Sequence, residues 1–337
     1  MIRRPPRSTP KPSSAASDVY KRQGKSMKFI SAQKIRKTIR LNSLISEIEN
    51  VYKNDADVPL RQVYNVSPKK SSDQLMLMPA FSVEGYYGVK LLNVFDNNPL
   101  IGLPRINAIY ILYDRKNGNI KATFDGTEIT KQRTSVMSAI ASKCLSKKDS
   151  KKLLVLGTGA LIPYMIRAHC SVRPIEEILI WGRNTNKVKK IVKFYKDSNY
   201  RVSSVECLEE ACATADIITS ATSSKKEFIN GSWLNKSVHI DLVGAHTKQM
   251  AELDPYGFSL GEIYVDDKEA VLVEAGDLIN SVNLGYINER NIKADIKQLI
   301  IENKIRRNNK EKITIYKSVG HGLSDLATAI YLFKNLN

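Results

Sequence analysis

The chain has 337 residues, of which 42% are apolar and 26% charged, and its formal net charge is +18. This length suffices for two domains with hydrophobic cores, and no run of about 18 apolar residues exists, which excludes a predicted membrane span. The cysteines form no CxxC pair and have no matching His spacing, so we expect reduced thiols in a cytoplasmic protein, without a disulfide framework or a metal site. They are Cys144, Cys170, Cys207 and Cys212.

The positive charge raises the question of a nucleic-acid partner, because a strongly basic surface binds phosphate backbones without sequence preference. The sequence contains no zinc finger, no RNA-recognition signature and no basic amphipathic stripe. We therefore expect no nucleic-acid partner. The charge instead suits anionic small molecules, such as a phosphorylated dinucleotide and a carboxylate substrate.

Residues 1–26 differ in composition from the remainder. They contain seven Lys or Arg residues and one Asp, are rich in Pro and Ser, and show no hydrophobic period. We expect a disordered leader. A transit peptide is the alternative, but an amphipathic apolar face is missing. The string also resembles translated sequencing-adapter sequence, so we expect it to be non-native and the native chain to start at Met27.

Residues 27–150 are predicted to form a mixed α and β domain. Helices are expected at residues 31–39, 42–53 and 131–144, the last capped by Thr130. An extended segment at residues 58–61 follows the second helix. An Asn-Gly turn at residues 117–118 joins two of the predicted strands as a hairpin. The predicted strands cover residues 74–79, 88–94, 107–114 and 120–124.

The next segment predicts a dinucleotide site. A short apolar run at residues 153–156 leads into a glycine turn, a helix at about 160–169 and a second apolar strand at 178–181. This order is typical of a Rossmann unit, in which the turn lets the backbone approach a pyrophosphate at the helix N-terminus. An ordinary glycine turn without nucleotide is the alternative, since Ile162 replaces the third glycine. The expected cofactor residues of the turn are Gly157, Thr158, Gly159, Ala160 and Leu161.

The end of the second strand predicts which dinucleotide binds. An NAD site usually has Asp or Glu there for the ribose hydroxyls. This chain has Arg183 and Asn184, followed by Thr185 and Lys187, and no acid. These residues suit a 2′-phosphate, so we predict NADP(H) as the preferred cofactor and NAD(H) as the alternative. A solvated loop charge is the structural alternative for Arg183.

Residues 151–309 are predicted to be the dinucleotide-binding domain. Strands ending near residues 221 and 243 are expected to place the nicotinamide half of the cofactor, through Ser220, Ala221 and Thr222 and through Val243, Gly244 and Ala245. The further predicted strands are residues 202–205, 216–221, 237–243, 262–265 and 313–319. The further predicted helices are residues 208–213, 295–303 and 324–336, with a solvated charged turn at 304–312.

Several motifs occur together outside the glycine turn. They are Met78-Pro79-Ala80, Gly88-Val89-Lys90, residues 125–134 and residues 317–327. With the glycine turn and Val243-Gly244-Ala245, the chain resembles the ornithine cyclodeaminase/mu-crystallin family over residues 27–333. The resemblance implies an α/β homodimer. It also implies a Rossmann domain inserted in an α+β substrate-binding and dimerisation domain, built from residues 27–150 and 310–337.

The resemblance also implies a carboxylate-binding site. Arg61, Lys90 and Arg133 match the basic substrate residues of the family. If the helix starts at residue 131, Arg133 lies in its first turn, where the helix dipole would add to its charge. Surface salt bridges are the alternative for all three.

The sequence differs from the cyclodeaminases of this family at two positions, and these differences narrow the predicted activity. Cyclodeaminases carry a Glu where this chain has Met76, and an Asp where it has His246. An enzyme that deprotonates a substrate ammonium needs such carboxylates. Their absence, and the strings at residues 157–169 and 244–254, make the chain similar to the Δ1-pyrroline-2-carboxylate (ketimine) reductases of the family.

The resemblance implies NAD(P)H-dependent reduction of a cyclic α-imino acid: Δ1-pyrroline-2-carboxylate to L-proline, or Δ1-piperideine-2-carboxylate to pipecolate. Arg133 and Arg61 would hold the carboxylate, and Lys90 or a water would supply the proton. His246 would contact substrate or cofactor, and Asp325 is either a helix-start acid or a catalytic group. Ornithine cyclodeamination, or NADPH binding without turnover as in mu-crystallin, are the alternatives.

Overall fold

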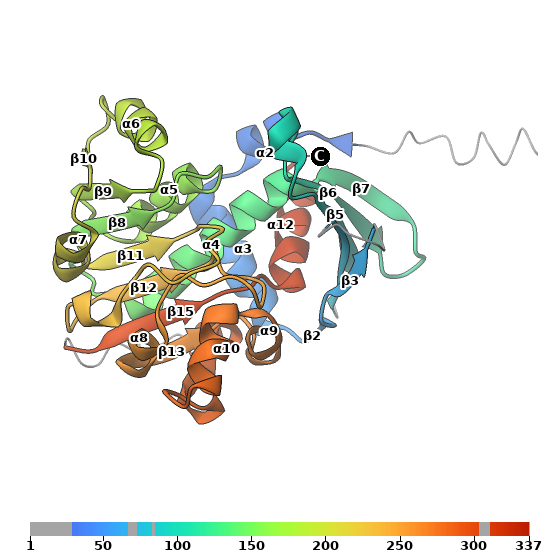
Figure 1. Cartoon of the computed structure of the whole chain (residues 1–337). Coiled ribbons are helices and arrows are strands. Elements are labelled where there is room, and N and C mark those ends of the chain that lie inside the picture. The colour runs from blue at the N-terminus through green and yellow to red at the C-terminus, as the bar shows by residue number, and fades with distance from the viewer. Residues whose placement is uncertain (1–28, 67–72, 83–84, 303–310, 337) are drawn as a thin grey trace, which may run out of the picture.

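The computed structural model describes residues 29–66, 73–82, 85–302 and 311–336. The expected leader and most of the expected charged turn lie outside these residues. The described chain forms two β-sheets with long helices between them, as Figure 1 shows. The predicted α/β class is confirmed. Among the described helices, none combines the length and the hydrophobicity that a membrane span requires.

The larger sheet has eight strands, and every pair in it is parallel. Its order is β10-β9-β8-β11-β12-β15-β13-β14, so consecutive strands proceed outward in opposite directions from the β8–β11 pair. Such a switch point opens a crevice at the carboxyl ends of the strands, where nucleotides bind in this kind of fold. The strands are β8 (Lys152–Leu156), β9 (Glu177–Trp181), β10 (Arg201–Ser204), β11 (Ile217–Ser220), β12 (His239–Leu242), β13 (Gly261–Val265), β14 (Ile292–Asp295) and β15 (Ile313–Lys317).

Helices cover both faces of this sheet, which explains its continuous apolar runs. In β8, Leu153 and Val155 belong to one hydrophobic cluster, while Leu154 and Leu156 belong to the other. The helix after the glycine turn begins at Ile162, two residues later than predicted. The helices are α5 (Ile162–Val172), α6 (Thr185–Phe194), α7 (Leu208–Thr214), α8 (Pro255–Ser259), α9 (Lys268–Glu274), α10 (Gly276–Asn283) and α11 (Ile296–Glu302).

The smaller sheet has seven strands, antiparallel except for the parallel β1–β7 pair. Its inner face packs on helices, and alternate residues of β5 such as Lys90, Leu92 and Val94 are buried there. The strands are β1 (Phe29–Ile30), β2 (Ala56–Asp57), β3 (Gln62–Asn65), β4 (Gln74–Ser82), β5 (Tyr86–Val94), β6 (Ile106–Asp114) and β7 (Ile120–Asp125).

Helices α2 (Ala32–Thr38), α3 (Leu41–Lys53), α4 (Gly126–Leu145) and α12 (Gly322–Asn335) pack at the centre (Figure 1). Helix α4 contacts β6 of one sheet and β12 and β15 of the other. It is buried on nearly all sides, and small residues such as Ser135, Ser138 and Ala139 allow this close packing. The central helices therefore join the two sheets into one body.

The predicted start of α4 was wrong. The helix begins at Gly126, directly after β7, and its cap is Asp125, whose Oδ1 accepts a hydrogen bond from Glu128 N at 2.8 Å. Thr130 instead lies inside the helix and donates to Gly126 O. A Cβ on Gly126 would lie 2.9 Å from the backbone of Ile109. Only glycine therefore fits at this close approach to β6, and Gly126 is the first residue of the helix.

The predicted boundary at residue 310 also requires correction. Residues 313–317 form β15, which pairs with β12 and β13 inside the eight-stranded sheet. Only α12, after β15, returns to the central helices. The strand was assigned to the substrate-binding part because periodicity identifies a strand but not its sheet. The remaining predicted elements agree within a few residues, while β1–β3, β14, α6 and α8–α10 were not predicted.

Replacing Asp125 with Ala should lower the free energy of unfolding by about 1 kcal/mol, because one N-cap hydrogen bond is lost. Thr130→Ala is the matched control and should cost clearly less, because its hydroxyl only bonds a carbonyl within the helix. Urea denaturation at fixed protein concentration measures both. Equal losses in the two variants would contradict the observed helix start.

Candidate active site

The carboxyl ends of β8, β9, β11 and β12 meet at one edge of the larger sheet. Gly157 has φ +123°, and a Cβ there would lie 2.9 Å from Ala221 O, whereas Gly159 has open space in front of it. No side chain caps the N-terminus of α5. The turn is therefore tight against the sheet and open outward, in front of a helix N-terminus that no side chain caps. These features fit a dinucleotide pyrophosphate.

The loop after β9 lies beside this turn, since a Cβ on Gly182 would lie 2.7 Å from Thr158 Cγ2. Arg183, Thr185 and Lys187 are exposed there. Asn184 is the cap of α6, and its Oδ1 accepts from Lys187 N at 3.0 Å. The Asn184 side chain thus has a structural partner, while the Arg183 guanidinium lies in solvent next to the expected adenosine position.

The segments expected on the nicotinamide side are held by Glu252, an acid whose role the sequence does not indicate. Glu252 is fully buried and accepts hydrogen bonds from the ends of both β11 and β12, through Ser220 Oγ, Thr222 N and Gly244 N among others. In the sequence, Glu252 stands out only as part of the family-like segment at residues 244–254. Nothing local in that string indicates which distant donors it meets.

Lys90, Arg133 and Asp325 form the centre of the candidate substrate site. The Asp325 carboxylate accepts from Lys90 Nζ at 2.6 Å through Oδ2 and from Arg133 Nε at 3.1 Å through Oδ1. Lys90 comes from the inner face of β5, Arg133 from α4 and Asp325 from the first turn of α12. All three side chains are buried. The structure therefore brings together three predicted residues from distant parts of the chain.

The position of Arg133 changes one part of the prediction. Because α4 begins at Gly126, Arg133 lies in its third turn and not in its first. The helix dipole acts mainly within the first turn, so it adds little to the charge of Arg133. Within the described residues, only Nε of the guanidinium donates to a protein group. Nη1 and Nη2 remain available to an incoming anion.

Burial sets the charge state of this cluster. Burial lowers the pKa of Lys90 to about 7, with Asp325 opposing that shift and Arg133 adding to it. Burial alone would raise the pKa of Asp325, but Lys90 and Arg133 lower it overall. Asp325 is therefore an anion, while Lys90 can change its charge near neutral pH. A lysine with this behaviour is a candidate proton donor.

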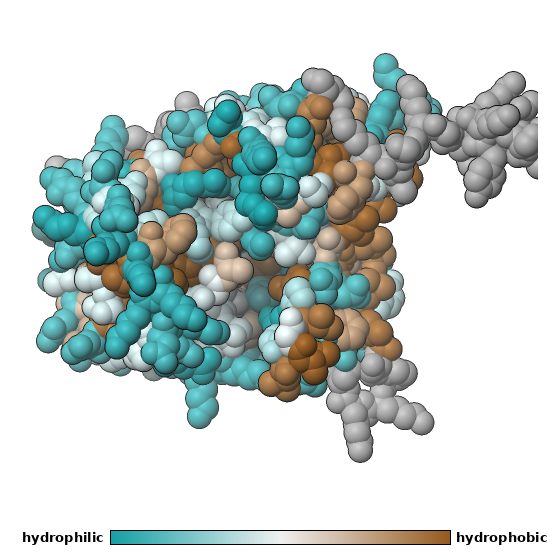
Figure 2. All heavy atoms as spheres, turned by 90° about the horizontal axis from the view of Figure 1, so that it is seen from above, coloured by the Kyte–Doolittle hydropathy of each residue, from teal (hydrophilic) through white to brown (hydrophobic). Residues whose placement is uncertain are grey.

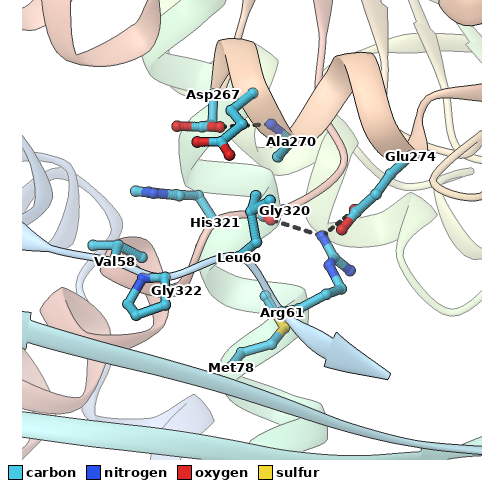
Figure 3. A pocket seen from close by; sticks show the side chains of 12 residues that line it. Val58, Leu60, Arg61, Met78, Asp267, Ala270, Glu274, Gly320, His321 and Gly322 are labelled. Carbon is cyan, nitrogen blue, oxygen red and sulfur yellow. Dashed lines mark hydrogen bonds and ion pairs between the residues drawn. The ribbon is translucent and has the colours of Figure 1, made fainter. Parts of the chain in front are cut away.

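Arg61 lies beside this cluster in a small pocket of about 40 Å³, shown in Figure 3. Its Nη2 donates to Val319 O at 2.6 Å and Gly320 O at 2.9 Å, and it forms an ion pair with Glu274 Oε2 at 2.9 Å. Burial lowers the pKa of Arg61 and raises that of Glu274 to about 6. Lys90 and Arg133 do not line this pocket. Glu274 was not foreseen from the sequence.

The turn from β15 to α12 connects these groups. Asp266 Oδ2 accepts from Ser318 Oγ, Val319 N and Gly320 N at 2.7, 3.0 and 2.6 Å. Gly320 has φ +96°, and a Cβ there would lie 2.9 Å from Arg133 Nη2. The turn therefore needs a glycine so that the backbone can pass beside the guanidinium. Asp266 is a second acid whose role could not be predicted from its local sequence.

His246 lies near Arg61 at the end of the β12 segment. Its Nδ1 is 2.7 Å from Gly244 O, and since a carbonyl only accepts, Nδ1 carries the proton and Nε2 keeps a lone pair. Burial, with Arg61 adding to it, lowers the pKa of His246 to about 4. The imidazole is thus neutral near pH 7. It differs from the acid expected of a cyclodeaminase in both charge and hydrogen-bonding capacity.

The fold and site define a Rossmann-type dinucleotide-binding protein with a buried cationic cluster. A model of the ornithine cyclodeaminase/mu-crystallin family matches residues 25–337, and the chain belongs to this family. The predicted family is therefore confirmed.

Three similar proteins span nearly the whole chain. Protein SAR DEFICIENT 4 of Arabidopsis thaliana is 34% identical over 89% of this chain and 95% of its own. A Δ1-pyrroline-2-carboxylate reductase of Colwellia psychrerythraea is 33% identical over 90% and 97%. The structure of the Thermococcus litoralis Δ1-pyrroline-2-carboxylate reductase, in complex with NADH and L-proline, is 31% identical over 92% and 97%, with a TM-score of 0.87.

Replacing Asp325 with Asn should lower the free energy of unfolding by about 3 kcal/mol at about pH 6, because two buried cations lose their shared anion. Adding Lys90→Met should recover part of this loss, since it removes one unpaired charge. Urea denaturation of the two single variants and the double variant measures the coupling. Strictly additive effects would mean that Lys90 and Asp325 do not interact energetically.

Proposed function

We propose that this protein uses NADH or NADPH to reduce the C=N bond of a cyclic α-imino acid. The substrate would be Δ1-pyrroline-2-carboxylate, giving L-proline, or the six-membered Δ1-piperideine-2-carboxylate, giving pipecolate. The observation that carries this proposal is the buried Lys90–Asp325–Arg133 cluster between the two sheets. The names of the Colwellia and Thermococcus relatives support the same reaction. We also propose that the smaller sheet belongs to the substrate-binding part and the larger sheet to the dinucleotide-binding part.

Arg133 and Arg61 are proposed to bind the substrate carboxylate. Arg133 offers Nη1 and Nη2, because its Nε is directed to Asp325. Arg61 forms an ion pair with the Glu274 carboxylate at 2.9 Å, and this contact supports the proposal that an anion binds at its position. A guanidinium binds a planar carboxylate through two parallel hydrogen bonds, which fixes orientation as well as position.

Lys90 is proposed to keep the substrate nitrogen protonated. A C=N bond accepts hydride readily only as the iminium, so a proton must be present on nitrogen when reduction occurs. Bound NAD(P)H supplies the hydride. Asp325 orients the Lys90 ammonium through the 2.6 Å bond and keeps part of the population charged at neutral pH. The neutral His246 offers Nε2 as an acceptor to a substrate N–H.

The surroundings of Met76 disfavour ornithine cyclodeamination. Met76 packs in a buried apolar cluster with Met78, Leu92 and Val94. A cyclodeaminase needs a carboxylate there to deprotonate the substrate ammonium, as the family resemblance implies. Together with the neutral His246, this cluster favours reduction of a ring that is already formed.

A homodimer is proposed from the outer face of the smaller sheet. Apolar side chains such as Leu91, Ile109 and Phe81 are only half-buried or exposed on it, and Tyr87 stacks on Tyr113 with ring centroids 4.9 Å apart. Figure 2 shows apolar surface gathered on the side where this sheet lies. A second copy would cover it, and sedimentation velocity measures whether it does. We also propose a reducing compartment such as the cytoplasm, because the cysteines show no disulfide-type spacing in the sequence.

The direct test is incubation of the protein with Δ1-pyrroline-2-carboxylate and NADH or NADPH while nicotinamide absorbance is followed. We expect oxidation of the cofactor with formation of one L-proline per cofactor. Binding of the cofactor without oxidation would instead support a mu-crystallin-like binding protein. Ammonia release from ornithine would support the cyclodeaminase.

The value of kcat/KM should fall as the pH rises through about 7, because Lys90 loses its proton near that pH. A lysine with a lowered pKa is charged below that value and neutral above it. Asp325→Asn should move this fall in kcat/KM to lower pH, since the Asp325 charge raises the pKa of Lys90. If kcat/KM falls at the same pH in the variant, the titrating group is the free substrate. That result would contradict the role of Lys90 in protonating the substrate nitrogen.

We propose NADP(H) as the preferred cofactor, from the exposed Arg183 beside Gly182 and the absence of an acid at the end of β9. Arg183→Ala should weaken NADPH binding about tenfold and leave NADH binding almost unchanged, because only NADPH carries the 2′-phosphate. Lys196→Ala, an exposed cation after α6, is the control. An equal change for both dinucleotides, or a clear NADH preference of the unchanged protein, would contradict the assignment.

A further inference from the structure

Glu252 has an unusual concentration of hydrogen-bond donors around a fully buried carboxylate. Oε1 accepts from Ser220 Oγ at 2.5 Å, Thr222 N at 2.8 Å and Thr222 Oγ1 at 2.9 Å. Oε2 accepts from Gly244 N at 2.8 Å and Ala245 N at 3.2 Å. Both oxygens are thus saturated by donors that come from two different strand ends.

These five contacts define the charge state of Glu252. Three donors are backbone N–H groups, which cannot accept, and they occupy both oxygens. Burial, with Asp277 adding to it, raises the pKa of Glu252 overall, although Lys317 and Ser220 act in the opposite direction. Lys317 pairs with Asp277 at 3.0 Å, and Asp277 in turn accepts from Glu252 N. The donor set and this cation behind it fit an ionised carboxylate.

The carboxylate draws the ends of β11 and β12 together. A Cβ on Gly244 would overlap Glu252 Oε1 and the backbone of Thr222, so only glycine fits between them. The amides of Thr222, Gly244 and Ala245 all turn inward to the acid. Gly244 O is taken by the His246 imidazole. The conformation of both segments therefore depends on one side chain.

We propose that Glu252 is a positioning residue for the nicotinamide half of the dinucleotide. It touches neither cofactor nor substrate, and it acts by fixing the segments 220–222 and 243–246. The inference rests on the proposed placement of the nicotinamide at these strand ends. The pyrophosphate turn belongs to β8 and α5. Its Gly157 packs against Ala221 O, but within the described residues no hydrogen bond of Glu252 reaches the turn itself.

Because the described side-chain hydrogen bonds of Glu252 are confined to the segments 220–222 and 243–246, its role can be distinguished from a general effect on stability. Glu252→Gln keeps the shape but replaces one acceptor oxygen with an NH₂ group that faces donors. We expect the dissociation constant of NADH to rise about tenfold or more, as a buried donor left without an acceptor implies. The dissociation constant of ADP-ribose, which lacks the nicotinamide, should stay within about twofold. Isothermal titration calorimetry measures both ligands.

Asp241→Asn is the matched control. Asp241 is a buried carboxylate on β12, but its partners are Ser138, Thr219 and His169, none of which belongs to the segments 220–222 and 243–246. Its loss should cost stability while the ratio of NADH to ADP-ribose affinity stays at the original value. If Glu252→Gln does not fold, Ser220→Ala removes one buried donor and should weaken NADH selectively, by a smaller factor.

Two outcomes would overturn the proposal. One is equal weakening of NADH and ADP-ribose in Glu252→Gln, which would indicate a general structural role. The other is unchanged NADH binding in a folded variant. A protein that binds NADH with the expected Glu252 dependence but reduces no imine would contradict the proposed reaction alone. The two proposals therefore fail separately.

Discussion

The ion cluster of Asp325, Lys90 and Arg133 is the interaction on which the site depends. Removing three charges from water is costly, and their mutual attraction offsets that cost only when their geometry is close and fixed. One anion faces two cations, so one positive charge remains uncompensated when Lys90 is protonated. Arg61 nearby is already balanced by Glu274. A substrate carboxylate would supply the missing negative charge, and this electrostatic demand explains why an α-imino acid suits the site.

The three residues of the cluster come from elements that belong to, or connect, both sheets. Lys90 belongs to the smaller sheet, Arg133 to the helix that touches both, and Asp325 to α12, which follows a strand of the larger sheet. The β15–α12 turn, held by Asp266, places Gly320 against Arg133. The position of the candidate carboxylate site relative to the proposed nucleotide edge is therefore set by packing at the centre, and small changes in that packing would alter both.

The parts predicted correctly from sequence were those with local signals. The strand–glycine–helix order at residues 153–169 determines its own conformation. The family motifs singled out Lys90 and Arg133, which the structure places beside Asp325, and their role in binding substrate stays a prediction. Local signals failed where a distant partner decides the outcome. The start of α4 is an exception, because its Asp125 cap is a local signal that the prediction overlooked. Residues 313–317 join the larger sheet by pairing with β12 and β13, which the local pattern does not reveal. Likewise, Glu252 and Glu274 have no neighbours in sequence that reveal the donors they meet.

The most direct measurement is a crystal structure of the protein with NADH and L-proline bound. The account predicts that the proline carboxylate lies within hydrogen-bond distance of Arg133 Nη1 or Nη2, with Lys90 Nζ close to the ring nitrogen and the nicotinamide against the ring. A proline carboxylate bound elsewhere, with Arg133 and Lys90 contacting only Asp325, would contradict it.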